Sequence, residues 1–367
     1  MNPDPVLPLT QAVVAAGLEQ GLHIGAQIFV SVRGKPVAHL AIGESRPGVP
    51  MHSDTLMLWM SSSKPVAAVA ILQLVQRGRL QLNHPVASHI PEFAAGGKEQ
   101  VTIQHLLTHT GGFRMADVGG PETPWEEIID RICRAKLERG WIPGEKAGYH
   151  VHSSWYILGE LVARLSGQSY SDYVRQEIFE PCGMLDSWVG MPEERFHAYG
   201  NRLGVMPNTE KPDQPPHRWS SFEGVTHCAP GGNGHGPIRE LGYFYEMLLG
   251  GGARLGRRIL SAESANLMTS RQREGIFDET FRHVMDWGLG LIVDSNRYGA
   301  DTVPYGYGRY CSPQTYGHSG SQSSVGFADP EHGLAVGVVF NGTPGERKHQ
   351  QRIKAVNEAI YMDLGLV

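Results

Sequence analysis

Residues 58–66 read LWMSSSKPV and place three serines and a lysine at the start of an apolar segment. Ser61 and Lys64 stand three positions apart, so on a helix their side chains lie on one face. Pro65 is tolerated only near a helix start, which puts Ser61 at the positive end of the helix dipole. Burial and this dipole both disfavour the cationic form of Lys64, and a neutral amine can accept the proton of a serine hydroxyl. The pattern indicates an activated serine nucleophile with its base.

The same residues also have a purely structural interpretation, in which the serines cap the helix and Lys64 extends to solvent. The sequence VAAVAILQLVQRG that follows Pro65 is apolar on nearly every side up to Leu74 and stops at Gly78. A helix that is apolar all round is predicted to be buried. This burial favours the chemical interpretation, and residues elsewhere in the chain must decide.

Composition excludes several classes of function. The chain has 367 residues, 41% of them apolar, and a formal charge of −5 without a long run of Lys or Arg, so we expect no nucleic-acid partner and no anionic membrane surface. No stretch approaches the roughly 20 apolar residues of a membrane span. The first residues lack a basic segment followed by an apolar core, and four cysteines are scattered without a CxxC pair. We therefore expect a reduced, cytoplasmic protein.

The order of predicted elements indicates an α/β fold of the α+β type. Residues 23–45 are predicted to form two strands around Arg33-Gly34-Lys35, because apolar and β-branched residues flank a glycine-bearing turn. Period-3.6 spacing predicts helices through much of residues 80–200, whereas the Pro- and Gly-rich segment 205–236 is predicted to be loop. Strand character returns before a final helix in three segments: 287–293, 315–329 and 333–342.

Early and late strands are expected to join in one antiparallel sheet flanked by helices, with a helical subdomain inserted between them. The prediction is a single catalytic domain over residues 1–367. Its α/β part would comprise residues 1–75 and 237–367, and its mostly helical part residues 76–236.

Four segments, in order, carry a wider pattern: SSSKPVAAVAILQLVQRGRLQLNHPV, VTIQHLLTHTGGF, PGEKAGYHVHSSWYILGELVARLSG and YGHSGSQSSVGFADPEHGLAVGVVFNG. Together they resemble the serine β-lactamase and penicillin-binding-protein superfamily, within it the class C β-lactamase-like esterases, D-aminopeptidases and acyltransferases. The resemblance covers roughly residues 20–360. It implies a β-lactamase/transpeptidase-like fold, with Ser61 as nucleophile and Lys64 as its partner.

The resemblance also implies a Tyr-x-Asn motif whose tyrosine oxygen faces the serine. Tyr149 stands six residues after Pro143, as the family spacing asks, but counting back from Tyr156 reaches Val151 instead. We assign Tyr149, because neither valine nor serine supplies a phenolate. The structural alternative is an aromatic side chain that anchors the loop.

The asparagine of this motif is missing, because the third residue of Tyr149-His150-Val151 is valine. In the family that asparagine orients the lysine and contacts the substrate amide, so its absence affects β-lactam and peptide recognition more than acyl chemistry. Ser153 could substitute if the loop bulges, and His150 or His152 could fill the vacated space at the substrate.

A third motif, His318-Ser319-Gly320, stands where classical β-lactamases have Lys-Thr-Gly. A histidine there is expected to donate to a substrate carbonyl or carboxylate with a charge that depends on pH. Gly320 would let substrate lie against the strand, and the Ser321 N–H would join that of Ser61 in an oxyanion hole. Without the family, GHSGSQSS is only a Gly/Ser-rich strand end.

Two further groups of residues are candidates for a substrate contact or a metal site. The tyrosine-rich tract 297–317, with Tyr307, is either a substrate wall or a cover for the sheet edge. His105 and His109 have a zinc-compatible spacing, but no glutamate follows His105, and we expect no metal site.

The sequence therefore predicts a cytoplasmic serine hydrolase that forms an acyl-enzyme on a small-molecule ester or amide, without a cofactor. A carboxylic ester hydrolase is favoured by the HSG motif and the missing asparagine. The alternatives are an acyltransferase that uses an amine or alcohol, a β-lactamase or D-amino-acid peptidase, and a binding protein that kept the scaffold. The oligomeric state does not follow from the sequence.

Overall fold

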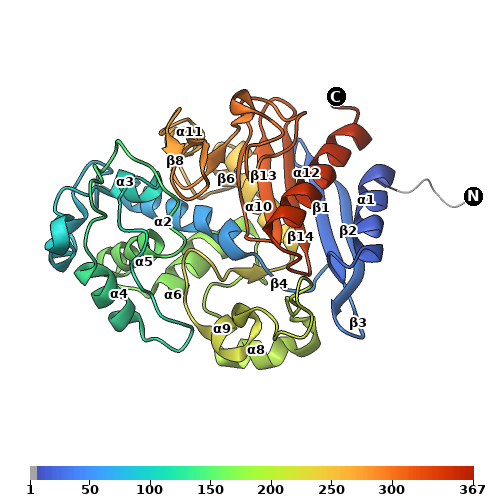
Figure 1. The fold of residues 1–367 in the computed structure, drawn as a ribbon, viewed down its shortest axis with the longest axis horizontal. Coiled ribbons are helices and arrows are strands. Elements are labelled where there is room, and N and C mark those ends of the chain that lie inside the picture. The colour runs from blue at the N-terminus through green and yellow to red at the C-terminus, as the bar shows by residue number, and fades with distance from the viewer. Residues whose placement is uncertain (1–5) are drawn as a thin grey trace, which may run out of the picture.

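The computed structural model describes residues 6–367 and contains one large antiparallel sheet with helices around it (Figure 1). The eight strands lie in the order β10-β11-β12-β13-β14-β1-β2-β3. Their bounds are β1 Gly25–Val32, β2 Lys35–Arg46, β3 Val49–Pro50, β10 Asp286–Trp287, β11 Ile292–Val293, β12 Tyr316–Ser319, β13 Ser324–Asp329 and β14 Leu334–Phe340. Early and late strands thus meet where β1 pairs with β14, which confirms the predicted fold class.

Three two-stranded pairs lie outside this sheet: β4 Met57–Leu58 with β5 His235–Gly236, β6 Ala253–Arg254 with β7 Arg257–Arg258, and β8 Phe277–Asp278 with β9 His283–Val284. The helices are α1 Pro8–Glu19, α2 Lys64–Gln76, α3 Ile103–Leu107, α4 Trp125–Arg134, α5 Ser153–Ser166, α6 Tyr170–Val174, α7 Glu180–Cys182, α8 Glu193–Tyr199, α9 Phe222–Thr226, α10 Ile238–Leu249, α11 Ala262–Thr269 and α12 Glu346–Asp363. None of the helices in residues 6–367 is long and apolar enough to cross a membrane.

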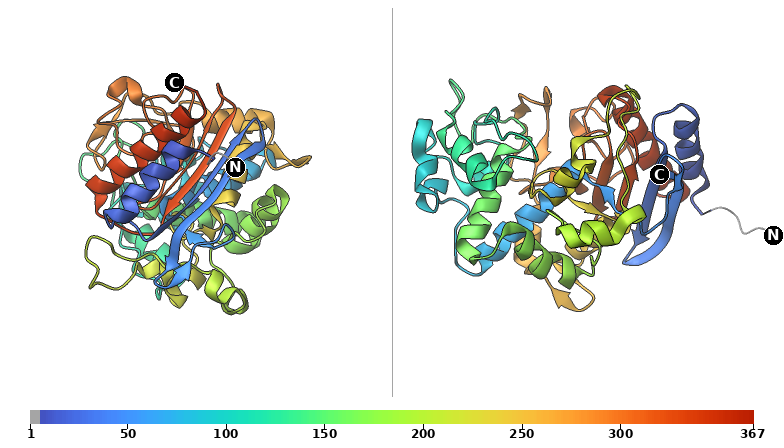
Figure 2. Two further views of the ribbon diagram at one scale, coloured as in Figure 1. Left: turned by 90° about the vertical axis from the view of Figure 1, so that its right-hand side faces the viewer. Right: turned by 90° about the horizontal axis from the view of Figure 1, so that it is seen from below.

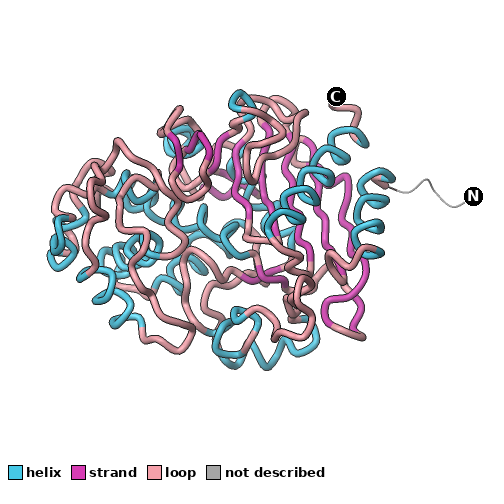
Figure 3. Tube along the Cα trace, in the orientation of Figure 1, coloured by secondary structure: helices cyan, strands magenta, loops and turns pink. Residues whose placement is uncertain are grey.

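Helices cover both faces of the sheet. The terminal helices α1 and α12 lie side by side on one face, as the left view of Figure 2 shows, and they share a buried cluster with Ile28 and Val30 of β1. Helix α10 packs on the other face, where Phe29 belongs to the larger core. The alternation along β1 assigns successive side chains to opposite cores. Most of the remaining helices gather beyond this face, at the other end of the molecule (Figure 3).

Helix α2 runs through the centre of the larger core, as the apolar sequence after Pro65 predicts. Every residue from Lys64 to Leu74 is buried. The helix contacts α5 and α6 on its helical side and β12 on the sheet side. It therefore runs from the helical side of the molecule to the sheet, where its start lies beside β12.

The structure departs from the predicted elements mainly at short turns. Residues 287–293 form the hairpin β10–β11 rather than one strand, and 315–329 form the hairpin β12–β13. Residues 205–236 contain α9 and all of β5 as well as loop. Residues 320–323 connect β12 to β13, and this connection adjoins the first turn of α2.

Candidate active site

The first serine of the SSSK sequence lies on a single 3-10 turn, Met60–Ser63, that leads directly into α2. Met60 has a positive φ of 51°, a left-handed conformation that non-glycine residues seldom adopt. Because Ser61 is near the start of this turn, its backbone N–H has no intrahelical carbonyl to bind. The chain thus presents both the hydroxyl and the amide of Ser61 beside β12.

The other two serines hold this turn in place. Ser62 Oγ donates to the carbonyl of His318 at 3.0 Å, and Ser63 Oγ donates to the carbonyl of Met60 at 2.6 Å. Ser63 Oγ also accepts from the N–H of Gly234 at 2.9 Å. Neither makes a side-chain cap on α2, contrary to the structural interpretation of the sequence. They attach the nucleophile turn to β12 and to the loop before β5.

Lys64 is fully buried, so it does not extend to solvent. Its Nζ lies 2.8 Å from the carbonyl of Val151, 2.5 Å from that of Gly231 and 3.0 Å from Ser61 Oγ. Burial holds the pKa of the amine well below its usual value. A neutral amine has two N–H groups, which match the two carbonyls, and one lone pair, which remains for the Ser61 hydroxyl.

Tyr149 lies beside this pair. Its backbone N–H donates to Asp278 Oδ1 at 3.1 Å, and its ring centroid lies 4.8 Å from that of Phe281. Burial raises the pKa of the phenol, although a hydrogen bond with the Ser61 side chain lowers it in part. Lys64 Nζ is 5.1 Å from the ring centroid. Tyr149 therefore lies against both groups, and its phenol is protonated.

The structure also shows what replaces the missing asparagine. Val151 turns its backbone carbonyl to Lys64, so a main-chain oxygen orients the lysine where the family uses a side chain. Ser153 does not substitute, because its Oγ contacts His150 Nδ1 at 2.9 Å inside the protein. Neither histidine fills the vacated space: His150 and His152 are not among the residues that line the cavity at Ser61. Burial lowers the pKa of both imidazoles to about 3.

His318 differs from its expected pH-dependent behaviour. It is buried, and burial lowers its pKa to about 3, so the ring is neutral at ordinary pH. Its Nδ1 lies 2.8 Å from the carbonyl of Ser319. Because a carbonyl only accepts, Nδ1 carries the proton and Nε2 is left as an acceptor. The expected donation from His318 to a substrate carbonyl or carboxylate is therefore corrected to acceptance.

The structure requires glycine at position 320 for a reason other than the expected one. A Cβ there would lie 2.3 Å from the carbonyl oxygen of Trp59 and 2.9 Å from Met60 Cβ, so the glycine admits the nucleophile turn rather than the substrate. This close approach brings the next residue, Ser321, to the cavity that Ser61 lines. Within residues 6–367 the Ser321 N–H donates to no protein group, which leaves it free for an oxyanion.

Ser61, Tyr149, His318, Ser319 and Ser321 line one cavity of about 370 Å³. Tyr307 does not: it is fully buried, and its hydroxyl donates to the carbonyl of Ile292 at 3.0 Å. The expected substrate contact at Tyr307 is therefore wrong, and it belongs to the sheet-covering alternative. The remaining lining residues are Val151, Thr280, Phe281, Ile292, Pro304, Tyr305, Glu346 and Gln350.

Comparison with known proteins places the chain in a family. The family model described as Beta-lactamase matches residues 10–360. The chain belongs to the Beta-lactamase family. Accordingly, it is an enzyme of the serine-hydrolase kind. Penicillin-binding protein 4 of Amycolatopsis lactamdurans is 30% identical over 87% of this chain and 81% of its own. Esterase EstB of Burkholderia gladioli is 32% identical, but the match spans only 50% of this chain and 52% of that protein.

Solved structures of Beta-lactamase-family type agree with this assignment. A penicillin-binding protein homologue from Caulobacter crescentus superposes with a TM-score of 0.79 at 27% identity, covering 98% of both chains. A family VIII carboxylesterase has the same TM-score and identity, over 97% of this chain and 98% of its own.

Sequence reasoning missed part of the Beta-lactamase-family cavity. Glu346 and Gln350 come from the first turns of α12, which follows β14 in the sequence. No local sequence pattern marks them as cavity residues. Tyr305 lies in the tyrosine-rich tract 297–317, two residues before Tyr307. Only the tertiary structure decides which of these tyrosines faces the serine.

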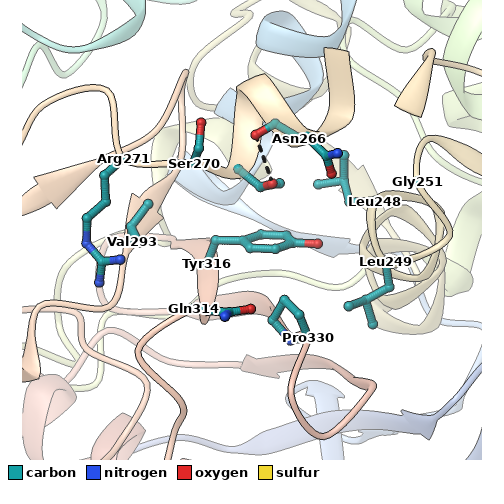
Figure 4. Close-up of a pocket in the computed structure, with 11 residues that line it drawn as sticks. Leu248, Leu249, Gly251, Asn266, Ser270, Arg271, Val293, Gln314, Tyr316 and Pro330 are labelled. Carbon is teal, nitrogen blue, oxygen red and sulfur yellow. Dashed lines mark hydrogen bonds between the residues drawn. The ribbon is translucent and has the colours of Figure 1, made fainter. Parts of the chain in front are cut away.

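A larger cavity of about 460 Å³ lies at α10, α11 and strands β11 and β12, with Tyr316 across its middle (Figure 4). It contains none of the residues of the three motifs. Its one charged side chain, Arg271, is held by Asp286 at 2.9 Å and by the carbonyl of Pro313 at 2.7 Å. The smaller cavity at Ser61 is therefore the candidate active site of this Beta-lactamase-family enzyme.

Proposed function

We propose that this enzyme is a carboxylic ester hydrolase that forms an acyl-enzyme on Ser61. The observation that carries the proposal is the environment of the Lys64 amine. Two carbonyls use its N–H groups, and the Ser61 hydroxyl lies 3.0 Å away on the remaining side. An amine held neutral in this way is a base for the serine proton.

In the proposed reaction Ser61 Oγ attacks the ester carbonyl carbon while its proton passes to Lys64 Nζ. The backbone N–H groups of Ser61 and Ser321 hold the oxyanion, a contribution of several kcal/mol in such sites. The Tyr149 phenol gives its proton to the leaving alkoxide and regains one from Lys64. Water then attacks the carbonyl carbon of the acyl-enzyme. Tyr149 and Lys64 take up the proton of the water and return one to Ser61 Oγ as its bond to the acyl group breaks and the acid leaves.

The raised pKa of Tyr149 fixes the division of roles. A buried phenol keeps its proton at neutral pH, so it is suited to donate to a leaving group and unsuited to act as the resting base. The lowered pKa of Lys64 has the opposite consequence. Burial in one site therefore makes Lys64 the base and Tyr149 the acid of a pair.

Ester hydrolysis is favoured over β-lactam or peptide hydrolysis by what the cavity lacks. The residue in the asparagine position, Val151, offers no side-chain amide to a substrate amide. His318 is neutral, so it supplies no positive charge for a substrate carboxylate. Two of the relatives above are named as an esterase and a carboxylesterase.

Acyl transfer is the second candidate. Aromatic and aliphatic side chains form much of the cavity wall, among them Phe281, Ile292 and Tyr305. An apolar wall favours an alcohol or amine acceptor over water at the acyl-enzyme. Product analysis with and without added alcohols distinguishes the two, because only a transferase diverts the acyl group to the acceptor.

We also propose a small-molecule substrate and a reducing, cytoplasmic location. The cavity volume suits a small ester. All four cysteines are free thiols and three of them are buried. Packing of reduced thiols in this way is usual in cytoplasmic proteins.

The test is covalent labelling by a fluorophosphonate probe, read by intact mass and by fragmentation of the labelled peptide. We expect one adduct, on Ser61, and loss of both the adduct and p-nitrophenyl butyrate turnover in Ser61→Ala. The variant should keep the wild-type melting temperature, since the Ser61 side chain makes no structural hydrogen bond besides those within the site. A variant that hydrolyses the ester at the wild-type rate would overturn the proposal.

A further inference from the structure

The cavity at Ser61 carries an asymmetric set of charges. Among the described residues that line it, Glu346 is the one acidic side chain, and none is lysine or arginine. Glu346 forms no ion pair with any residue in 6–367, although Arg347 and Lys348 are its neighbours in sequence. The lining therefore presents an uncompensated negative charge.

A short chain of hydrogen bonds holds the Glu346 carboxylate at the cavity. Gln350 Nε2 donates to its Oε1 at 2.8 Å, and the Tyr305 backbone N–H holds Gln350 through Oε1 at 2.7 Å. Tyr305 and Ser321 line the same cavity as Glu346. Tyr305 adopts a positive φ of 56°, which this network maintains. The carboxylate is thereby linked, through Gln350, to the backbone of Tyr305 in the cavity wall.

Glu346 stands at the start of the last helix. It is in the first turn of α12, where the helix dipole stabilises a negative charge. It is also exposed, so it remains accessible from solvent at the mouth of the cavity.

A second observation disfavours an anionic ligand. His318 Nε2 and Ser319 Oγ are buried and have no hydrogen-bond partner within residues 6–367, and both residues line the cavity. The Nδ1–H contact with the Ser319 carbonyl makes His318 Nε2 an acceptor. A group that satisfies this acceptor must be a donor, which a carboxylate is not.

The cavity also has aromatic faces that attract cations. The ring of Phe281 lies 4.8 Å from Tyr149 and 5.6 Å from Tyr305, centroid to centroid. Aromatic faces favour ammonium groups, and quaternary ones in particular. The carboxylate and the aromatic wall thus favour a cation, and the unpaired acceptor disfavours a carboxylate.

We propose that this cavity selects esters that carry a cationic ammonium group and discriminates against esters that carry a carboxylate, with Glu346 as the specificity-determining residue. This inference rests on the proposed function, because Ser61 cleaves the bound ester. It differs from that function in concerning charge selection alone.

The experiment compares thioesters of one acyl group, so that all share the same acyl-enzyme. S-butyryl thiocholine is the cation, S-(3,3-dimethylbutyl) thiobutyrate its neutral isostere, and S-butyryl 3-mercaptopropionate the anion. A second pair places the charge on the acyl side: the p-nitrophenyl esters of 4-(trimethylammonio)butanoic acid and of the isosteric 5,5-dimethylhexanoic acid. The readout is kcat/KM for each, at low salt and at about 0.5 M NaCl, where surface charges are screened.

In the wild type we expect kcat/KM for the cation to exceed that for its neutral isostere by about tenfold in at least one pair, and to fall with salt. The anion should be the poorest thioester. Glu346→Gln should bring the cation-to-neutral ratio close to one, because the charge is lost while the amide oxygen still accepts from Gln350. Glu358→Gln is the matched control on the same helix, about 18 Å away along its axis, and should change no ratio.

Two results would overturn the inference: equal kcat/KM for the cation and its isostere in both pairs, or a preference for the cation that survives in Glu346→Gln. In either case the neutral esters would still be cleaved through Ser61. Failure of the proposed function looks different, because then no ester depends on Ser61.

Discussion

Lys64 binds two backbone carbonyls and has one hydroxyl to activate, and Lys98 is a natural comparison. Both lysines are fully buried, and Lys98 donates to the carbonyls of Ala95, Cys133 and Ala135, with no serine in reach. One buried amine therefore joins loops and the other faces a nucleophile.

We predict that Lys64→Met lowers kcat/KM for p-nitrophenyl butyrate by about 10³-fold, because the base is lost. Lys98→Met should leave kcat per folded molecule unchanged but destabilise the protein by about 2 kcal/mol, because three carbonyls lose their donor. Steady-state kinetics and urea unfolding of the two variants check this. Equal activity losses in both would mean that Lys64 is structural.

Tyr149 is predicted to matter in proportion to the basicity of the leaving group. Tyr149→Phe should lower kcat/KM by about 10²-fold for an alkyl ester, whose alkoxide needs a proton, and much less for a p-nitrophenyl ester. The ratio of the two losses is the measurement. The same loss for both esters would contradict a proton-donor role.

The pH dependence of kcat/KM should have one acidic limb, set by the lowered pKa of Lys64. Activity requires the neutral amine, so it falls as pH decreases through that pKa. His318 adds no limb above about pH 4, because burial lowers its pKa to about 3. His318→Gln should therefore keep the shape of the profile, and an altered limb between pH 5 and 8 (the usual range for histidine,) would contradict the neutral assignment.

At the scale of elements, the site is the junction of a 3-10 turn with a strand end. Ser62 binds β12 through the His318 carbonyl, and Gly320 lets β12 approach the carbonyl of Trp59. The two N–H groups of the proposed oxyanion site come from this turn and from the connection that follows β12, so their separation depends on this contact.

Gly320→Ala tests that contact. The added Cβ would meet backbone at 2.3 Å, and the hairpin β12–β13 would have to shift away from the nucleophile turn. We expect kcat to fall by about 10²-fold or more through loss of the Ser321 donor. Gly306→Ala, whose Cβ would find no atom nearer than 3.6 Å, is the control and should retain activity.

For the whole molecule, local patterns predicted most elements but not the residues that meet across the site. Helix α2 and the hairpin β1–β2 follow from apolar periodicity and a turn with Arg33 and Gly34 at positive φ. The SSSK sequence also predicted a buried lysine beside Ser61. These features depend on neighbours in the chain.

Long-range contacts account for what the sequence did not show. Val151 acts through its backbone carbonyl, which no side-chain pattern encodes. Tyr305 and Tyr307 are alike in sequence, and only tertiary packing distinguishes them. Tyr305 is held by α12 and faces the cavity, whereas Tyr307 is bound to β11 and faces the core. Glu346 reaches the cavity from the last helix of the chain.

The central claim is an uncharged amine beside the serine, and [15Nζ]-lysine NMR measures it directly. The Lys64 resonance is assigned by its disappearance in Lys64→Met, with Lys98→Met to assign the other buried amine. The account predicts a neutral Lys64 amine at pH 8 and titration well below the roughly 10.4 of a free lysine. A Lys64 signal that stays that of an ammonium up to about pH 10 would contradict it.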